Sequence, residues 1–142
     1  MINHLNSLLI EGVLVNDPEI VAHVKSSPDV KLVKFTLAND YYYVGTDGSK
    51  KKDTLFLPVQ TWGALAERCF VQMRKGMTAR CVGKLKQRNW ETESGEKHCV
   101  LELVAKHIEY KSPRKNEVKV LDAPDNDADE PKLSESDVFY VI

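Results

Sequence analysis

The chain has 142 residues, with 20 lysines and arginines against 21 aspartates and glutamates, so its formal net charge at pH 7 is −1. This length is enough for one folded core and excludes two domains of ordinary size. The charge is divided unevenly, because residues 1–115 carry 18 basic against 13 acidic side chains and residues 116–142 carry 2 against 8. A basic body with an acidic tail is typical of a polyanion-binding surface, and an acidic tail also serves some proteins only as a solubilising segment.

The three cysteines, Cys69, Cys81 and Cys99, are odd in number and widely spaced. This pattern argues against a disulfide framework and a zinc site, so we expect no metal and no other cofactor. Cys81 and Cys99 alternate with apolar neighbours, and we expect both to be buried strand residues. The sequence has no signal-peptide pattern and no run of about 18 apolar residues, so we expect a cytoplasmic protein with no membrane partner.

Two strands are predicted before residue 40. Residues 8–15 are rich in apolar and β-branched side chains and end at the turn signal Asn16-Asp17-Pro18. Gly12 inside this strand indicates a bulge or a sharp bend, which small barrels use to close. After a predicted loop, residues 31–39 alternate between apolar and polar side chains, with Val33, Phe35 and Leu37 on the apolar side.

Residues 40–53 predict a long exposed hairpin. It begins with Tyr41-Tyr42-Tyr43 and returns through Lys50-Lys51-Lys52. Between them lies Asp47-Gly48, where the glycine supplies the positive φ that a tight turn requires. Three consecutive tyrosines cannot all point inward from one strand, so at least one of them is expected to be exposed.

A strand, a helix and two more strands are predicted after the hairpin. Residues 55–60 are expected to form the third strand, and the apolar spacing over residues 62–73 predicts the helix. Residues 77–86 predict the fourth strand, and a polar turn at residues 93–96 leads to the fifth. The fifth strand covers residues 98–108, with Cys99, Leu101 and Leu103 expected on one side.

Three strands, a helix and two strands make the order of the OB-fold, a five-stranded Greek-key barrel whose second and third strands bind oligonucleotides. We therefore predict an all-β protein with one helix between strands three and four. Residues 1–112 are expected to form this domain, and residues 113–142 a disordered acidic tail with an apolar tip. A barrel of another family can share this order, so function must be argued from the site.

Several short motifs occur in order and at compatible spacing along the chain. They are Leu9-Ile10-Glu11-Gly12 followed by Asp17-Pro18-Glu19, then Phe35-Thr36-Leu37-Ala38, Trp62-Gly63-Ala64-Leu65-Ala66-Glu67, Arg74-Lys75-Gly76, Val82-Gly83-Lys84-Leu85 with Arg88 and Trp90, and Ser94-Gly95. With this series, residues 4–110 resemble the bacterial single-stranded DNA-binding protein (SSB) family. Each motif is weak alone, and their ordered combination is specific. The resemblance implies an OB-fold domain whose partner is single-stranded DNA.

Six aromatic side chains are the candidates for stacking on bases: Tyr41, Tyr42, Tyr43, Phe56, Trp62 and Trp90. The resemblance implies base contacts at the last four of these, with Tyr43 where the family often has Trp. The residues alone leave alternatives open, because Phe56 lies between two leucines and fits the core equally well. Trp62 can equally pack the helix against the barrel, whereas the polar neighbours of Trp90 favour the surface.

Seven cations are the candidates for phosphate contacts: Lys34, Lys50, Lys51, Lys52, Lys84, Lys86 and Arg88. Over residues 81–86 the alternation sends the two lysines to one face of the strand and the apolar side chains to the other. Lysines neutralise phosphates whatever the base, so this set predicts binding without sequence preference. The alternative for residues 50–52 is a merely soluble loop tip.

The resemblance also implies a homotetramer and a tail that recruits replication and repair proteins. The family tail usually has several aspartates and then a short apolar tip that closes on Pro-Phe. Here acidic residues precede the candidate partner-binding segment, which comprises Asp137, Val138, Phe139, Tyr140, Val141 and Ile142. An acidic stretch with an apolar end is kept, but the Pro-Phe ending is absent.

These observations predict a non-enzymatic protein that binds and protects single-stranded DNA, without sequence preference, in replication, recombination and repair. Its expected location is the cytoplasm, associated with the nucleoid. The alternative is an OB-fold adaptor between proteins, with residues 139–142 as its docking peptide. An enzyme with a thiol–imidazole pair is disfavoured, because His98 and Cys99 are neighbours in a predicted strand and point to opposite faces.

Overall fold

The computed structural model describes residues 1–24, 27–112 and 139–142. The described elements run in the order β1 (Leu8–Leu14), β2 (Glu19–Val24), β3 (Ser27–Val44), β4 (Lys50–Trp62), α1 (Gly63–Gln72), β5 (Thr78–Glu91), β6 (Lys97–Lys111) and β7 (Tyr140–Val141). The five predicted strands correspond to β1, β3, β4, β5 and β6, with the first ending and the fourth beginning one residue outside the observed bounds, and the predicted helix is α1. In the part of the chain that the structure describes, no helix is long and apolar enough to cross a membrane.

The strands form one sheet in the order β1-β5-β6-β4-β3-β2, which closes into a barrel. Closure comes from β1, which pairs with β5 along most of its length and with β3 at Val13↔Ala38 and Leu14↔Leu37. The parallel contact between β4 and β6 completes the Greek-key path. The predicted all-β, five-stranded barrel with one helix between its third and fourth strands is therefore confirmed.

The barrel interior is filled by side chains from alternate residues of the strands. Val33, Phe35 and Leu37 of β3 are buried, as their alternation predicts. Phe35 and Leu37 pack with buried residues from the other barrel strands and from α1. Gly12 has a structural reason other than a bulge: a Cβ there would lie 2.7 Å from the Ala38 carbonyl oxygen, so its absence lets β1 approach β3.

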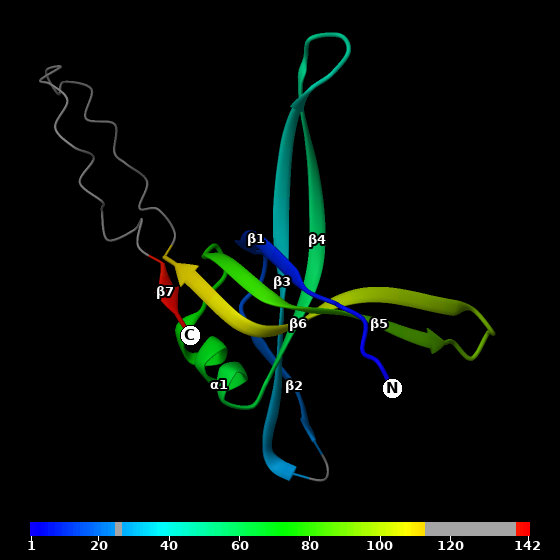
Figure 1. Cartoon of the computed structure of the whole chain (residues 1–142), viewed down its shortest axis with the longest axis vertical. Coiled ribbons are helices and arrows are strands. Elements are labelled where there is room, and N and C mark those ends of the chain that lie inside the picture. Colours follow the sequence, from blue (N-terminus) through cyan, green and yellow to red (C-terminus); the bar gives the residue numbers. More distant parts are fainter. Residues whose placement is uncertain (25–26, 113–138) are drawn as a thin grey trace, which may run out of the picture.

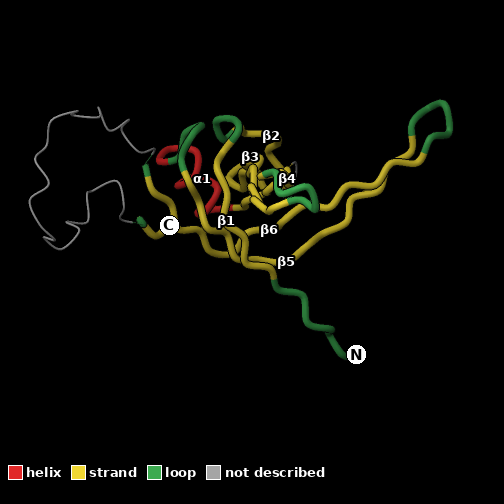
Figure 2. The backbone as a smooth tube through the Cα atoms, turned by 90° about the horizontal axis from the view of Figure 1, so that it is seen from above, coloured by secondary structure: helices red, strands yellow, loops and turns green. Residues whose placement is uncertain are grey.

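Two long ribbons project from the barrel, formed by β3 with β4 and by β5 with β6 (Figure 1). The β3–β4 ladder continues as far as Val44↔Lys50, beyond the predicted strands, and Gly48 turns it with a φ of 79°. Figure 2 shows the β5–β6 ribbon reaching to one side of the barrel, with α1 on the other side. A protruding ribbon has solvent on both faces, which changes the environment of any apolar residue placed there.

The ribbons explain why one sequence prediction is wrong. Cys99 and Leu101, expected on the buried side of the fifth strand, are exposed, and Leu101 is 52% exposed. Only Leu103 of that series reaches the core. The alternation is present, but its apolar face leaves the barrel interior where β6 becomes part of the ribbon.

Two segments of the described chain contain strands where none was predicted. The predicted loop between the first two strands contains β2, which pairs with the beginning of β3. Residues 139–142, predicted to belong to a disordered tail, contain β7, which pairs with β6 at Glu109↔Val141 and Tyr110↔Tyr140. The rest of the predicted tail, residues 113–138, lies outside the described residues, as do Asp137 and Val138 of the candidate partner-binding segment.

Candidate nucleic-acid interface

One face of the barrel collects side chains from β3, β4, β5 and β6. In the β3–β4 register Lys34 pairs with Gln60, Ala38 with Phe56 and Tyr42 with Lys52. In the β5–β6 register Lys86 pairs with Glu102 and Trp90 with His98. Paired residues point to the same side of a sheet, and the contacts described next join the two strand pairs. We call this the outer face: Lys34, Tyr42, Lys52, Phe56, Gln60, Trp62, Lys84, Lys86, Arg88, Trp90, His98 and Glu102.

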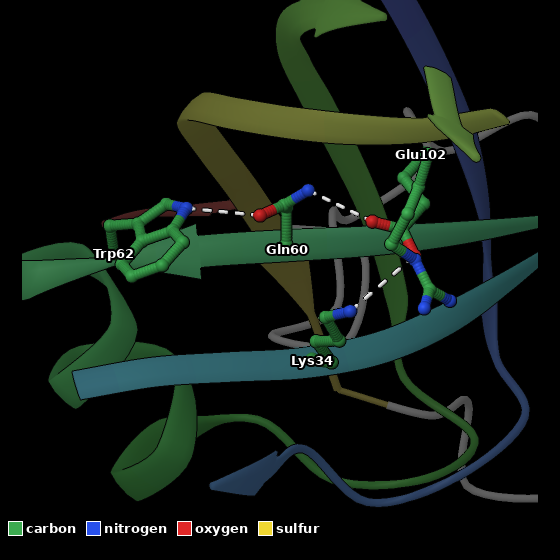
Figure 3. Close-up of polar contacts among 5 residues, drawn as sticks. Lys34, Gln60, Trp62 and Glu102 are labelled. Atoms are coloured by element: carbon green, nitrogen blue, oxygen red, sulfur yellow. Dashed lines mark hydrogen bonds and ion pairs between the residues drawn. The ribbon is translucent and has the colours of Figure 1, made fainter. Parts of the chain in front are cut away.

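Glu102 lies at the centre of the outer face and is only 3% exposed. Its Oε1 pairs with Lys34 Nζ at 3.4 Å and with Arg88 Nε at 3.2 Å. Its Oε2 accepts a hydrogen bond of 2.9 Å from Gln60 Nε2. Gln60 in turn accepts a hydrogen bond of 3.1 Å from the indole nitrogen of Trp62 (Figure 3). One carboxylate therefore links two side chains that are candidates for phosphate contacts and one candidate stacking residue.

This network fixes the geometry of the surface before any ligand arrives. A buried carboxylate is stable only when cations and hydrogen-bond donors surround it, and Glu102 has both. Holding Trp62 through Gln60 restricts the orientation of the indole plane, which would lower the entropy lost if a flat ring stacked on it. Sequence reasoning missed Glu102, although a single carboxylate within the apolar run of residues 100–105 was a visible signal.

The aromatic candidates of the outer face are accessible. Phe56 is 62% exposed, so the core alternative for this residue is wrong. Trp62 precedes α1 as its N-cap residue and is 39% exposed. Trp90 is 40% exposed and lies near the end of β5, where the indole stacks on His98 at 5.2 Å and the Arg88 guanidinium lies 4.7 Å from its ring centre. An open hollow there is lined by Asn89, Trp90, Glu91, Lys97, His98 and Cys99.

The three tyrosines are divided between the two faces of the β3–β4 ribbon. Tyr42 shares the face of Phe56 by register, four residue pairs farther along the ribbon. Tyr41 and Tyr43 point to the other side, where their rings stack with centroids 6.1 Å apart. All three side chains are exposed. The structure thus brings Tyr42 to the outer face, and Tyr43, the position implied by the family resemblance, to the opposite side of the ribbon.

The cationic candidates fall into two groups. Lys34 and Arg88 are both held by Glu102, as described above. The other five are exposed and make no ion pair with any residue that the structure describes: Lys50, Lys51, Lys52, Lys84 and Lys86. A phosphate can approach the second group without displacing a carboxylate, whereas at the first group it must compete with Glu102.

Comparison with known proteins decides which family the chain belongs to. The model of the single-strand binding protein family matches residues 5–111. The chain belongs to the single-strand binding protein family. It is 34% identical over 110 residues to the single-stranded DNA-binding protein of Caldanaerobacter subterraneus, covering 78% of this chain and 70% of that one. Single-stranded DNA-binding protein A of Bacillus subtilis is 29% identical over 111 residues, covering 78% of this chain and 61% of that one.

Solved structures of this family have the same fold. The Plasmodium falciparum SSB in complex with ssDNA superimposes with a TM-score of 0.66 at 19% identity, over 75% of this chain and 90% of that one. A deletion mutant of the Thermus aquaticus single-stranded DNA-binding protein gives 0.65 at 21% identity, over 78% of this chain and 52% of that one. These likenesses support the OB-fold assignment of the barrel.

Membership of the single-strand binding protein family also answers the enzyme alternative, because this is a family of binding proteins and not of enzymes. Among the residues that the structure describes, no cluster of histidine, cysteine and carboxylate side chains is arranged to hold a metal ion.

The thiols of this family member should differ sharply in reactivity. Burial raises the pKa of the Cys69 and Cys81 thiols to about 12, whereas Cys99 is exposed on the β5–β6 ribbon. At pH 8 a thiol with such a pKa is a thiolate in only about one molecule in 10⁴, and the thiolate is the reactive form. We expect Ellman's reagent to label one thiol per folded chain and three after unfolding. Rapid labelling of Cys99→Ser would contradict this assignment.

Proposed function

We propose that the protein binds single-stranded DNA without sequence preference, by stacking bases on aromatic side chains and by pairing phosphates with lysines and arginines. The observation that carries this proposal is the outer face, where exposed aromatic side chains lie together with cationic ones on the barrel and its two ribbons. Family membership supports single-stranded DNA as the ligand. Relatives named single-stranded DNA-binding proteins support the same choice.

The stacking residues of the proposed path are Tyr42, Phe56, Trp62 and Trp90. Every base has a π-face, so stacking on these rings tolerates any sequence. Tyr41 and Tyr43 would offer a second stacking surface on the other side of the ribbon. A strand that passes around the β3–β4 ribbon would contact both surfaces, because the ribbon projects freely from the barrel (Figure 1).

The phosphate contacts are proposed for the lysines and the arginine that flank this path. Lys84 and Lys86 lie on the outer face of β5, and Lys52 lies beside Tyr42. Lys34 and Arg88 would contact a phosphate once it replaces Glu102 as their ion-pair partner. Lysines carry no information about the base, and their neutralisation of phosphates releases counterions.

We also infer that the protein forms a homotetramer, works in replication, recombination and repair in the nucleoid-associated cytoplasm, and recruits partner proteins through its acidic tail. Support for assembly comes from apolar side chains that the single chain leaves in water, namely Leu9 and Val13 on β1 and Leu101 on the β5–β6 ribbon. Light scattering tests the assembly, since a tetramer has four times the mass of the chain.

The test of DNA binding is a titration of tryptophan fluorescence with oligo-dT at several salt concentrations. We expect quenching, because Trp62 and Trp90 are the tryptophans of the chain and both belong to the outer face. The logarithm of the affinity should fall linearly with the logarithm of the salt concentration. Absence of binding at low salt would reject the proposal in favour of the adaptor between proteins.

Changing Lys50, Lys51 and Lys52 together to alanine should flatten this salt dependence. The slope should fall by about 0.7 for every phosphate that the variant no longer neutralises, the value for single strands. Lys75→Ala is the control, because Lys75 is exposed in the turn after α1 and lies outside the outer face. A triple variant with the slope of the wild type would mean that residues 50–52 are only a soluble part of the ribbon.

A further inference from the structure

The edge of β6 near its end holds a short peptide. Residues 108–111 of β6 pair with β5 on one side, and the two middle residues also pair with β7 on the other. The register on the β7 side is Glu109↔Val141 and Tyr110↔Tyr140. The Ile142 amide then donates a hydrogen bond of 2.9 Å to the Ile108 carbonyl oxygen. This arrangement is strand addition, in which main-chain bonds hold a peptide and side-chain contacts select it.

Side chains on both sides of the edge fit residues 139–142. The Phe139 ring lies 4.1 Å from the Arg80 guanidinium and 4.9 Å from Lys111 Nζ. The Tyr140 ring contacts Tyr110, with centroids 5.5 Å apart. Ile142 packs against the barrel core. Two cations around an aromatic ring and an apolar contact at Ile142 define which peptide the edge accepts.

Arg80 is held in place for this contact. Its guanidinium forms an ion pair with Glu11 of β1, the strand that neighbours β5 on the other side. The two side chains are 46% and 47% exposed, so the pair favours the position of the guanidinium near the Phe139 ring without fixing it. Three strands thus contribute to the site, since β1 orients Arg80, β5 carries it and β6 supplies the edge.

This edge is distant from the aromatic residue at the other end of the same ribbon. Trp90 pairs with His98 near the beginning of β6, whereas residues 139–142 lie at its end. Figures 1 and 2 show β7 beside α1, on the side of the barrel opposite to the β5–β6 hairpin tip. The docked segment therefore leaves Trp90 uncovered.

The contact is small enough to be reversible. The strand β7 has two residues, and Tyr140 and Val141 remain 45% and 66% exposed. Segment 139–142 nevertheless contacts the domain through its main-chain hydrogen bonds to β6 and through the side chains of Phe139 and Ile142. A partner protein that recognises the side chains of Phe139 and Ile142 cannot bind them while they lie on β6.

We propose that residues 108–111 of β6, together with Arg80 of β5, form a peptide-docking site whose ligand is segment 139–142 of the same chain. Docking withholds this segment from partner proteins. The docking site stands on the contacts above. Its effect on partners rests on the recruiting role given to the tail under the proposed function.

The test uses a fluorescent peptide of residues 137–142 and the full-length chain. The double variant Phe139→Ala with Ile142→Pro removes the aromatic ring and the Ile142 amide donor, so its β6 edge becomes vacant. The peptide should bind this variant and should bind the wild type about tenfold or more weakly, because the tethered segment competes at high effective concentration. Fluorescence anisotropy gives both affinities.

Matched peptides test the selectivity of the site. A peptide with Phe139→Ala should bind the vacant variant roughly tenfold more weakly, since it lacks the ring that both cations approach. A peptide with Val141→Ala should bind within about twofold of the original, because an exposed side chain contributes little. Hydrogen exchange followed by mass spectrometry should show residues 108–111 less protected in the vacant variant, with protection restored by the peptide.

Two results would overturn the docking site. One is equal peptide affinity for the wild type and the vacant variant, and the other is unchanged protection of residues 108–111. Oligo-dT titration at high salt separates this proposal from the function, because the vacant variant should keep wild-type affinity within about twofold. If the wild type itself does not bind oligo-dT, the proposed function is rejected, and the docking result still stands.

Discussion

Replacing Phe56 by alanine should weaken oligo-dT binding by about 1 to 3 kcal/mol, the range for losing one base–aromatic stack. Phe56 is 62% exposed on the outer face, and its ring makes no stacking contact with another ring among the described residues. The free energy of unfolding should change by no more than about 0.5 kcal/mol, because the side chain is at the surface. Fluorescence titration gives the affinity, and urea unfolding gives the stability.

Leu55→Ala is the control for this experiment. Leu55 is 53% exposed and precedes Phe56 on β4, so it points to the opposite face of the same strand. Its loss should leave oligo-dT affinity within about 0.5 kcal/mol of the wild type. An equal loss in both variants would indicate a general effect on the ribbon, and an unchanged Phe56→Ala would remove Phe56 from the proposed path. Light scattering on each variant checks that assembly is unchanged.

Replacing Glu102 by glutamine should change both stability and the salt dependence of binding. The amide keeps the shape of the side chain but removes the charge that pairs with Lys34 and Arg88. We expect a loss of about 1 to 3 kcal/mol of stability, because hydrogen bonds to a buried carboxylate are weakened. The two cations should become free for phosphates, so the salt dependence should steepen by about 0.7 for each additional phosphate neutralised.

Glu67→Gln is the charge-matched control for Glu102→Gln. Glu67 is an exposed carboxylate of α1, paired with Lys31 at 3.7 Å, and lies outside the outer face. The Glu67→Gln variant should have a salt dependence of binding and a stability close to those of the wild type, since exposed ion pairs contribute little to stability. A weaker affinity of Glu102→Gln with an unchanged slope would contradict the release of cations. That result would mean that Glu102 acts mainly by holding Trp62 through Gln60.

The amino-acid sequence by itself determined the elements of the barrel and their order. Alternation over residues 31–39 predicted which side of β3 is buried, because a strand that borders a core repeats every two residues whatever its partners are. The helical spacing before Lys75-Gly76 predicted α1 for the same local reason. The ordered motifs gave the family, since they depend on residue identity and spacing alone. These signals are local, and they are readable without knowing which strands pair.

The tertiary structure decided what depends on pairing between distant segments. Cys99 is exposed although its strand alternates correctly, because β6 leaves the barrel and becomes a ribbon. Glu102 joins side chains from β3, β4 and β5, and the division of Tyr42 from its two neighbours matters only once β3 pairs with β4. Segment 139–142 forms a strand only because β6 presents a free edge to it. Alternation determines the side of a strand on which each residue lies, whereas strand pairing determines what that side meets.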